Sequence, residues 1–122
     1  MYKRDEAFRF AFDEPISTSF AIKQVGEQMV SIPEGEGEIV NLSPNGLQFR
    51  TSLEITLISD QPVFSTFRFL LNDQEHYLQG EIVWKKHFAD QYYYGVSFDH
   101  DEHEQKQIIE AIKQLREKGN TM

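Results

Sequence analysis

The segment at residues 41–46 (Asn-Leu-Ser-Pro-Asn-Gly) contains the side chains best suited to ligand binding in this sequence. On an extended strand, Asn41 and Ser43 project from the same face, because side chains alternate with a period of two. An amide and a hydroxyl supply hydrogen-bond donors and acceptors, and Gly46 allows close approach of the backbone. The same residues are also typical of a type I turn, which requires no ligand. The spacing alone therefore favours a simple hairpin, and ligand binding is the second interpretation.

Basic side chains are the second feature that can do chemistry, since they attract anionic ligands. Residues 1–9 carry three bases and two acids, and two lysines follow Trp84. The intervening residues 10–84 carry 11 acids and only three bases. This distribution predicts either a small anion site on an acidic protein or a chance scatter of few residues.

The usual patterns of catalytic and metal sites do not occur in the sequence. There is no Gly-x-Ser-x-Gly, His-Glu-x-x-His or P-loop pattern, and zero cysteines exclude a thiol nucleophile and a Cys-ligated zinc. His100 and His103 come nearest to a metal site, but they lie at an acidic predicted helix start without the spacing that completes a ligand set. We therefore expect no enzyme, no metal and no cofactor.

Charge and length limit the partners and the architecture. A net charge of −8, from 12 basic and 20 acidic residues, disfavours DNA, RNA and anionic membranes as partners. No apolar run approaches the roughly 20 residues that span a bilayer, and no apolar segment follows the basic N-terminus. We expect a soluble, cytoplasmic protein without membrane insertion. A chain of 122 residues supports one core, so we predict a single domain over residues 1–122.

Alternation of apolar and polar residues predicts six or seven short strands over about residues 8–98. Many short strands in sequence favour an antiparallel barrel or sandwich. In this pattern Trp84 is predicted to face inward together with Leu78 and Ile82. The period changes near the C-terminus, where isoleucines and a leucine at helical spacing predict an amphipathic helix over about residues 102–118.

Several motifs, taken in order, resemble those of the PilZ domain family. Asn41, Ser43 and Gly46 match its Asp/Asn-x-Ser-x-x-Gly motif, and a basic segment precedes the first strand. Segment 80–84 (Gly-Glu-Ile-Val-Trp) is similar to the family's Gly-x-Val-x-Trp strand, and segment 94–98 (Tyr-Gly-Val-Ser-Phe) resembles its Gly-x-x-Phe strand. The resemblance covers about residues 2–115. We favour core packing as the role of four of these positions, namely Gly80, Trp84, Gly95 and Phe98.

The resemblance implies an antiparallel PilZ-like β-barrel with a C-terminal α-helix, and binding of cyclic di-GMP, a bacterial second messenger. An arginine fork can bind guanine or a phosphate of such a ligand. On this resemblance the ligand-binding residues are Arg9, Asn41, Ser43, Gly46 and Arg4, with Lys3 as a supplementary cation.

The family's Arg-x-x-x-Arg motif is altered in this sequence, because Arg4 and Arg9 are five positions apart. If Arg9 is the second arginine, Asp5 replaces the first, and if Arg4 is the first, Phe8 replaces the second. Two functions follow from this departure. The chain is either a cyclic di-GMP receptor that relays the signal to an unidentified protein partner, or a PilZ-like interaction module that binds protein and no nucleotide.

Overall fold

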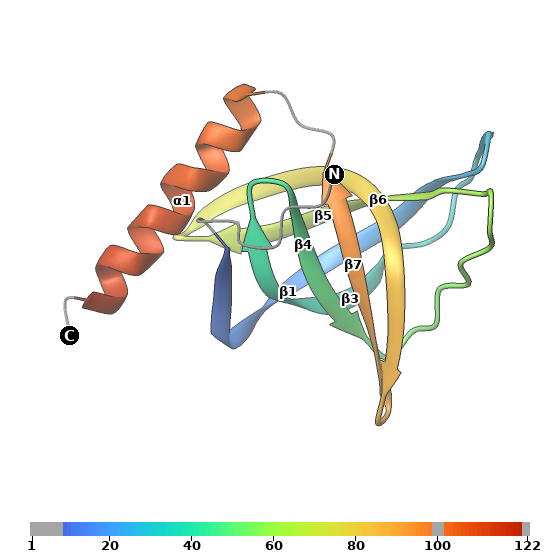
Figure 1. The fold of residues 1–122 in the computed structure, drawn as a ribbon, viewed down its shortest axis with the longest axis horizontal. Coiled ribbons are helices and arrows are strands. Elements are labelled where there is room, and N and C mark those ends of the chain that lie inside the picture. The colour runs from blue at the N-terminus through green and yellow to red at the C-terminus, as the bar shows by residue number, and fades with distance from the viewer. Residues whose placement is uncertain (1–8, 99–101, 121–122) are drawn as a thin grey trace.

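Seven strands and one helix make up the described chain in the computed structural model (Figure 1). The structure describes residues 9–98 and 102–120, and in the helix it describes the side chains of residues 105–115. The elements are β1 (Phe10–Val25), β2 (Gln28–Met29), β3 (Gly35–Ser43), β4 (Gly46–Thr51), β5 (Val63–Leu71), β6 (Gln74–Phe88), β7 (Gln91–Phe98) and α1 (Glu102–Asn120). The helix begins at the predicted residue and ends slightly later than predicted.

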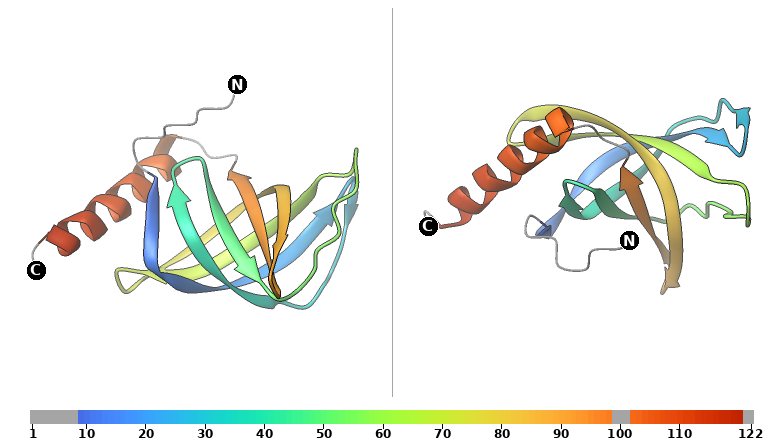
Figure 2. Two further views of the ribbon diagram at one scale, coloured as in Figure 1. Left: turned by 60° about the horizontal axis from the view of Figure 1, so that its bottom comes forward. Right: turned by 45° about the horizontal axis from the view of Figure 1, so that its top comes forward.

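The strands form one antiparallel sheet that closes into a ring (Figures 1 and 2). Neighbouring strands follow the order β2-β1-β3-β4-β7-β6-β5, and β1 also pairs with β5. At 16 residues, β1 is long enough to pair with β3 from Phe10 to Phe20 and with β5 from Thr18 to Val25. The predicted fold class, mainly β with antiparallel strands and a C-terminal helix, is confirmed.

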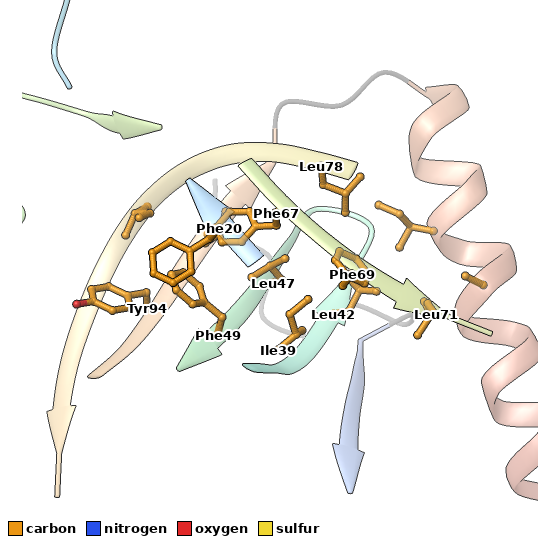
Figure 3. Packing of buried hydrophobic residues seen from close by; sticks show 14 of the residues in the cluster. Phe20, Ile39, Leu42, Leu47, Phe49, Phe67, Phe69, Leu71, Leu78 and Tyr94 are labelled. Atoms are coloured by element: carbon orange, nitrogen blue, oxygen red, sulfur yellow. The ribbon is translucent and has the colours of Figure 1, made fainter. Parts of the chain in front are cut away.

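Aromatic side chains from four strands fill the interior of the ring (Figure 3). The ring centroid of Phe49 lies 5.1 Å from that of Phe20, 5.0 Å from that of Phe67 and 5.1 Å from that of Tyr94. None of the four side chains is more than 4% exposed. Burial of this apolar area and the contacts between rings stabilise the fold, and the period-two alternation places these residues on the inner face.

The helix α1 packs beside one end of the ring (Figure 1). Its Ile108, Ala111 and Ile112 are buried in the same core as the strands. Asn72, in the turn between β5 and β6, donates hydrogen bonds of 3.2 Å to the Ala111 carbonyl and to Gln114 Oε1. These contacts fix the helix against the β5–β6 hairpin. Within the described residues, no helix is both long enough and apolar enough to cross a membrane.

A bulge in β3 decides which of its side chains leave the core. The register with β4 shifts between Ile39 and Asn41, so that Val40 is an extra residue. Ile39 and Leu42 are consequently both buried, although they are three positions apart. Asn41 lies between them and faces outward, where it pairs in register with Gln48.

A bulge in β6 reverses the orientation of Trp84. The register with β7 shifts between Ile82 and Trp84. Ile82 is buried, whereas Trp84 is 42% exposed. The prediction that Trp84 faces the core is therefore wrong, because an extra residue inverts the alternation beyond it. The other three positions assigned to packing agree with that role, since Gly80 and Gly95 are buried and Phe98 packs against the core.

Candidate functional site

A row of register partners crosses the outer face of the sheet between the two bulges. Along this row, each residue pairs with the next across one strand boundary. Such partners lie directly opposite one another on strands about 4.8 Å apart. We call these residues the outer row, which consists of Ala11 on β1, Asn41 on β3, Gln48 on β4, Gly95 on β7 and Trp84 on β6.

Arg9 reaches the outer row through Asn41. Its Nη1 donates a hydrogen bond of 3.3 Å to Asn41 Oδ1, and Asn41 Nδ2 donates one of 2.9 Å to Gln48 Oε1. These two bonds orient the Asn41 amide, with its oxygen toward the guanidinium and its nitrogen toward Gln48. The Arg9 side chain is exposed. A cation and two amides therefore lie in line on the surface, a set of groups suited to a polar anion.

Ser43 and Gly46 shape the hairpin beside this line of side chains. Ser43 is 2% exposed, and its hydroxyl donates a hydrogen bond of 3.3 Å to the Gly46 carbonyl. A Cβ at Gly46 would lie 2.2 Å from the carbonyl oxygen of Val96 on β7. Both residues thus have structural roles here: Ser43 bridges the turn, and Gly46 allows β4 and β7 to approach.

Trp84 ends the outer row with an aromatic surface. A Cβ at Gly95 would lie 2.0 Å from Trp84 Nε1 and 2.3 Å from its Cε2, so the indole occupies the space above Gly95. The indole therefore lies over β7, two strand spacings or about 10 Å from Asn41 on β3. Sequence reasoning missed Trp84 and Gln48 as site residues. Gln48 resembled any polar residue of an alternating strand, and the bulge that exposes Trp84 left no local sequence signal.

Arg50 lies near the outer row, but a carboxylate already engages it. It pairs in register with Glu38 on β3 and Tyr93 on β7. Its Nε donates a hydrogen bond to Glu38 Oε1 at 2.8 Å, and Nη2 lies 2.8 Å from the same oxygen. Hydrogen bonding to Tyr93 and to Glu38 raises the pKa of Arg50 above its ordinary value. An anion would have to displace Glu38 in order to reach Arg50.

Several predicted site residues lie outside the described part of the chain. Arg4 and Lys3 are among them, as is Asp5 of the altered arginine motif. The side chains of His100 and His103, the pair nearest to a metal-binding pattern in the sequence, are likewise not described. Across the residues that the structure does describe, no group of three or more His, Asp or Glu side chains is placed to hold a metal ion.

Comparison with known proteins decides the family. The sequence profile of the PilZ domain matches residues 3–114. The chain belongs to the PilZ domain family. The fold of this PilZ domain is similar to a solved structure described as the PilZ domain of CeSA from a cellulose-synthesizing bacterium, with a TM-score of 0.62 and 16% sequence identity. The alignment covers 88% of this chain and 97% of the other. Curated protein sequences give no match.

At this level of identity the structural likeness establishes the fold alone, and it confirms the PilZ-like fold expected from the order of the motifs. PilZ domains are in general receptor domains for cyclic di-GMP. In this PilZ domain the family profile spans the 41–46 hairpin and every residue of the outer row.

Proposed function

We propose that this PilZ domain is a non-catalytic, cytoplasmic receptor that binds cyclic di-GMP along the outer row and relays the signal to a partner protein. The line of hydrogen bonds from Arg9 through Asn41 to Gln48 is the observation that carries the proposal. It presents one guanidinium and two amides on a single face, and it needs no metal or cofactor.

Each part of cyclic di-GMP has a chemical counterpart in Arg9 or in the outer row. The ligand combines two guanines with two phosphodiester charges. The Arg9 guanidinium can bind guanine O6 and N7 together, or a phosphate, through two parallel hydrogen bonds. Asn41 and Gln48 can both donate to and accept from a base edge. The exposed indole of Trp84 offers a stacking surface about 10 Å from Asn41, within reach of a second base.

The N-terminal segment supplies the remaining contacts in this proposal. Arg4 adds a second guanidinium, with Lys3 as a supplementary cation, while Ser43 and Gly46 hold the hairpin next to Asn41. Asp5 opposes binding, because its carboxylate would lie close to a dianion in the register that makes Arg9 the second arginine of the motif. We therefore expect Asp5→Arg to strengthen binding.

Titration calorimetry with cyclic di-GMP tests the proposal directly. Trp84 is the only tryptophan of the chain, so its fluorescence gives an independent signal from the outer row. Arg9→Ala should weaken binding by about 2 kcal/mol, or roughly 30-fold, as expected for the loss of one charged partner. The matched control is Arg68→Ala on β5, whose guanidinium pairs with Glu34 at 3.2 Å and lies outside the outer row.

The salt dependence of the affinity provides a second measurement. Affinity should fall as salt is added, since the contacts are partly ionic. The proposal is rejected if the folded protein gives neither heat nor a fluorescence change at near-millimolar ligand. It is also rejected if Arg9→Ala and Arg68→Ala bind equally well.

The altered arginine motif favours one alternative function, a PilZ-like interaction module that binds protein and no nucleotide. Asp5 supports this alternative, because a carboxylate at that position disfavours an anionic ligand. The variant Asp5→Arg separates the two functions. If the variant binds cyclic di-GMP and the natural chain does not, the pocket is otherwise intact. If neither of them binds, the interaction module is the better description.

A further inference from the structure

Part of β6 has an edge that no other strand within residues 9–98 covers. β5 pairs with β6 only as far as Ile82, whereas β7 pairs with it as far as Phe88. Residues 83–88 are therefore hydrogen-bonded on the β7 side alone, and in the right-hand view of Figure 2 they lie at the margin of the ring. The open side presents backbone N–H and C=O groups, which can pair with an additional strand.

The outer face of this edge alternates between apolar and basic side chains. Trp84, Lys86 and Phe88 occupy every second position, and Trp84 and Phe88 are 42% and 63% exposed. Lys86 is also exposed, and it makes no ion pair with another described residue. Large exposed apolar side chains that flank a polar one are typical of an interaction surface.

The basic side chains on the other face of the edge are already engaged. Lys85 Nζ lies 2.7 Å from Glu54 Oε2 and 5.3 Å from the centroid of the Tyr92 ring. His87 stacks on Tyr92 with ring centroids 4.4 Å apart. Lys85 and His87 thus brace the β6–β7 hairpin, whereas Lys86 is exposed on the outer face.

A groove continues this edge at the point where pairing with β5 ends. It has a volume of about 460 Å³ and lies between residues 57–62 and residues 81–83. Ile58 and Val83, which line it, are 56% and 51% exposed. An added strand that extends past Trp84 would reach this groove with an apolar side chain.

We propose that the 83–88 edge of β6 binds an extended acidic segment of a partner protein as an added antiparallel strand. The segment places apolar side chains opposite Trp84 and Phe88, and a carboxylate opposite Lys86. Cross-strand pairs of this kind stabilise a sheet, whereas like charges directly opposite destabilise it. The proposal goes beyond nucleotide binding and does not depend on it.

A second copy of this chain is a poor occupant of the same edge. A two-fold antiparallel pairing that sets Trp84 opposite Phe88 would set Lys86 opposite the same lysine of the second copy. The charge of the edge therefore favours a different protein with acidic residues in an extended segment.

The test uses the full chain without nucleotide and two synthetic peptides. The first is acetyl-Thr-Val-Thr-Glu-Thr-Val-Thr-amide, and the second has lysine in place of glutamate. In NMR spectra of the protein, the glutamate peptide should shift the amides of residues 83–88 and slow their hydrogen exchange. Lys86→Glu should weaken this peptide about fivefold and strengthen the lysine peptide. The matched charge change Lys23→Glu, on β1, should leave both affinities unchanged.

Three results would overturn the proposal. The first is the absence of amide shifts in residues 83–88 at near-millimolar glutamate peptide, and the second is a set of shifts confined to other strands. The third is a dimer in sedimentation together with concentration-dependent amide shifts in residues 83–88. Peptide binding without binding of cyclic di-GMP supports the edge and removes the nucleotide proposal. Nucleotide binding without peptide binding supports the nucleotide proposal and removes the proposal for the edge. The failure of one proposal can therefore be told from the failure of the other.

Discussion

The variant Gly46→Ala tests whether Gly46 is needed for the close approach of two strands or for ligand binding at the 41–46 hairpin. At Gly46, β4 lies so close to β7 that an added Cβ would be 2.2 Å from the Val96 carbonyl oxygen and 3.6 Å from Ser97 Cα. Ordinary van der Waals contact begins at 3.4 Å. The obstacle is the backbone of a paired strand, so no rotation of a side chain can relieve it.

The cost of this substitution follows from the separation that it forces. β4 and β7 must move apart by roughly 1 Å where Gly46 pairs with Ser97. The neighbouring atoms of the two strands are then farther apart than the distance at which their van der Waals attraction is strongest. Overpacking of this kind costs about 1–3 kcal/mol, and each weakened backbone hydrogen bond adds about 1 kcal/mol. We expect a total of about 2–4 kcal/mol. In a domain of this size that loss lowers the melting temperature by roughly 8–16 °C.

Thermal and urea unfolding followed by circular dichroism measure this loss, with Gly95→Ala as the matched control. A Cβ at Gly95 also meets a close neighbour, but that neighbour is the exposed indole of Trp84, which can swing away. We expect Gly95→Ala to unfold within about 1 kcal/mol of the natural chain. Its tryptophan emission should shift, because the indole has lost its place over β7.

A melting temperature for Gly46→Ala within a few degrees of the natural value would refute this reasoning. The glycine would then serve something other than strand approach. If the expected loss is observed, Gly46→Ala is unsuitable for testing ligand affinity, because reduced binding would reflect unfolding. Arg9→Ala is then the informative variant for the nucleotide.

Two further substitutions test a buried hydroxyl in the core and a partly buried histidine, His76, on β6. Tyr94→Phe should lower the free energy of unfolding in urea by about 2 kcal/mol. The buried hydroxyl accepts a 2.7 Å hydrogen bond from Ile55 N and donates one of 3.0 Å to the Leu53 carbonyl, and both are lost. An unchanged urea midpoint would contradict this. Burial lowers the pKa of His76 in the folded chain below its usual value of 6.5, so protonation of the ring favours the unfolded chain. The stability that the neutral ring contributes is therefore complete above pH 6.5. It is lost as the pH falls from 6.5 toward the pKa of His76 in the folded chain. His76→Phe should therefore lose less stability than the natural chain between about pH 7.5 and pH 5.5, and parallel pH profiles would count against it.

The strands and the core were predictable because they depend on local alternation. Phe49 and Phe67 follow period-two runs, and such runs place every second residue on a buried face. The C-terminal helix was predictable for the same reason at a different period. Order and spacing of motifs then identified the family without any information on contacts.

Much of the candidate site was not predictable, because it depends on where a strand contains one extra residue. The bulge at Val40 turns Asn41 outward, and the register shift before Trp84 exposes the indole. A bulge is a property of two strands in register and not of either sequence alone. The pairing of Asn41 with Gln48 required the same non-local information. Arg9, which the motif resemblance indicated, is in hydrogen-bonding contact with Asn41 as a result.

Because β1 pairs with both β3 and β5, the ring is completed only after strands far apart in the sequence have been synthesised. The Thr18 hydroxyl donates a hydrogen bond to the Arg68 carbonyl, a residue 50 positions later in the chain. A nascent chain that has released only β1, β3 and β4 therefore carries an uncovered strand edge until β5 leaves the ribosome. Such edges associate with other chains, and non-local pairing of this kind is slow. The outer edge of β4 stays uncovered for longer, because its partner is β7. We expect the interval between β4 and β7 to be the period in which this chain depends most on chaperones.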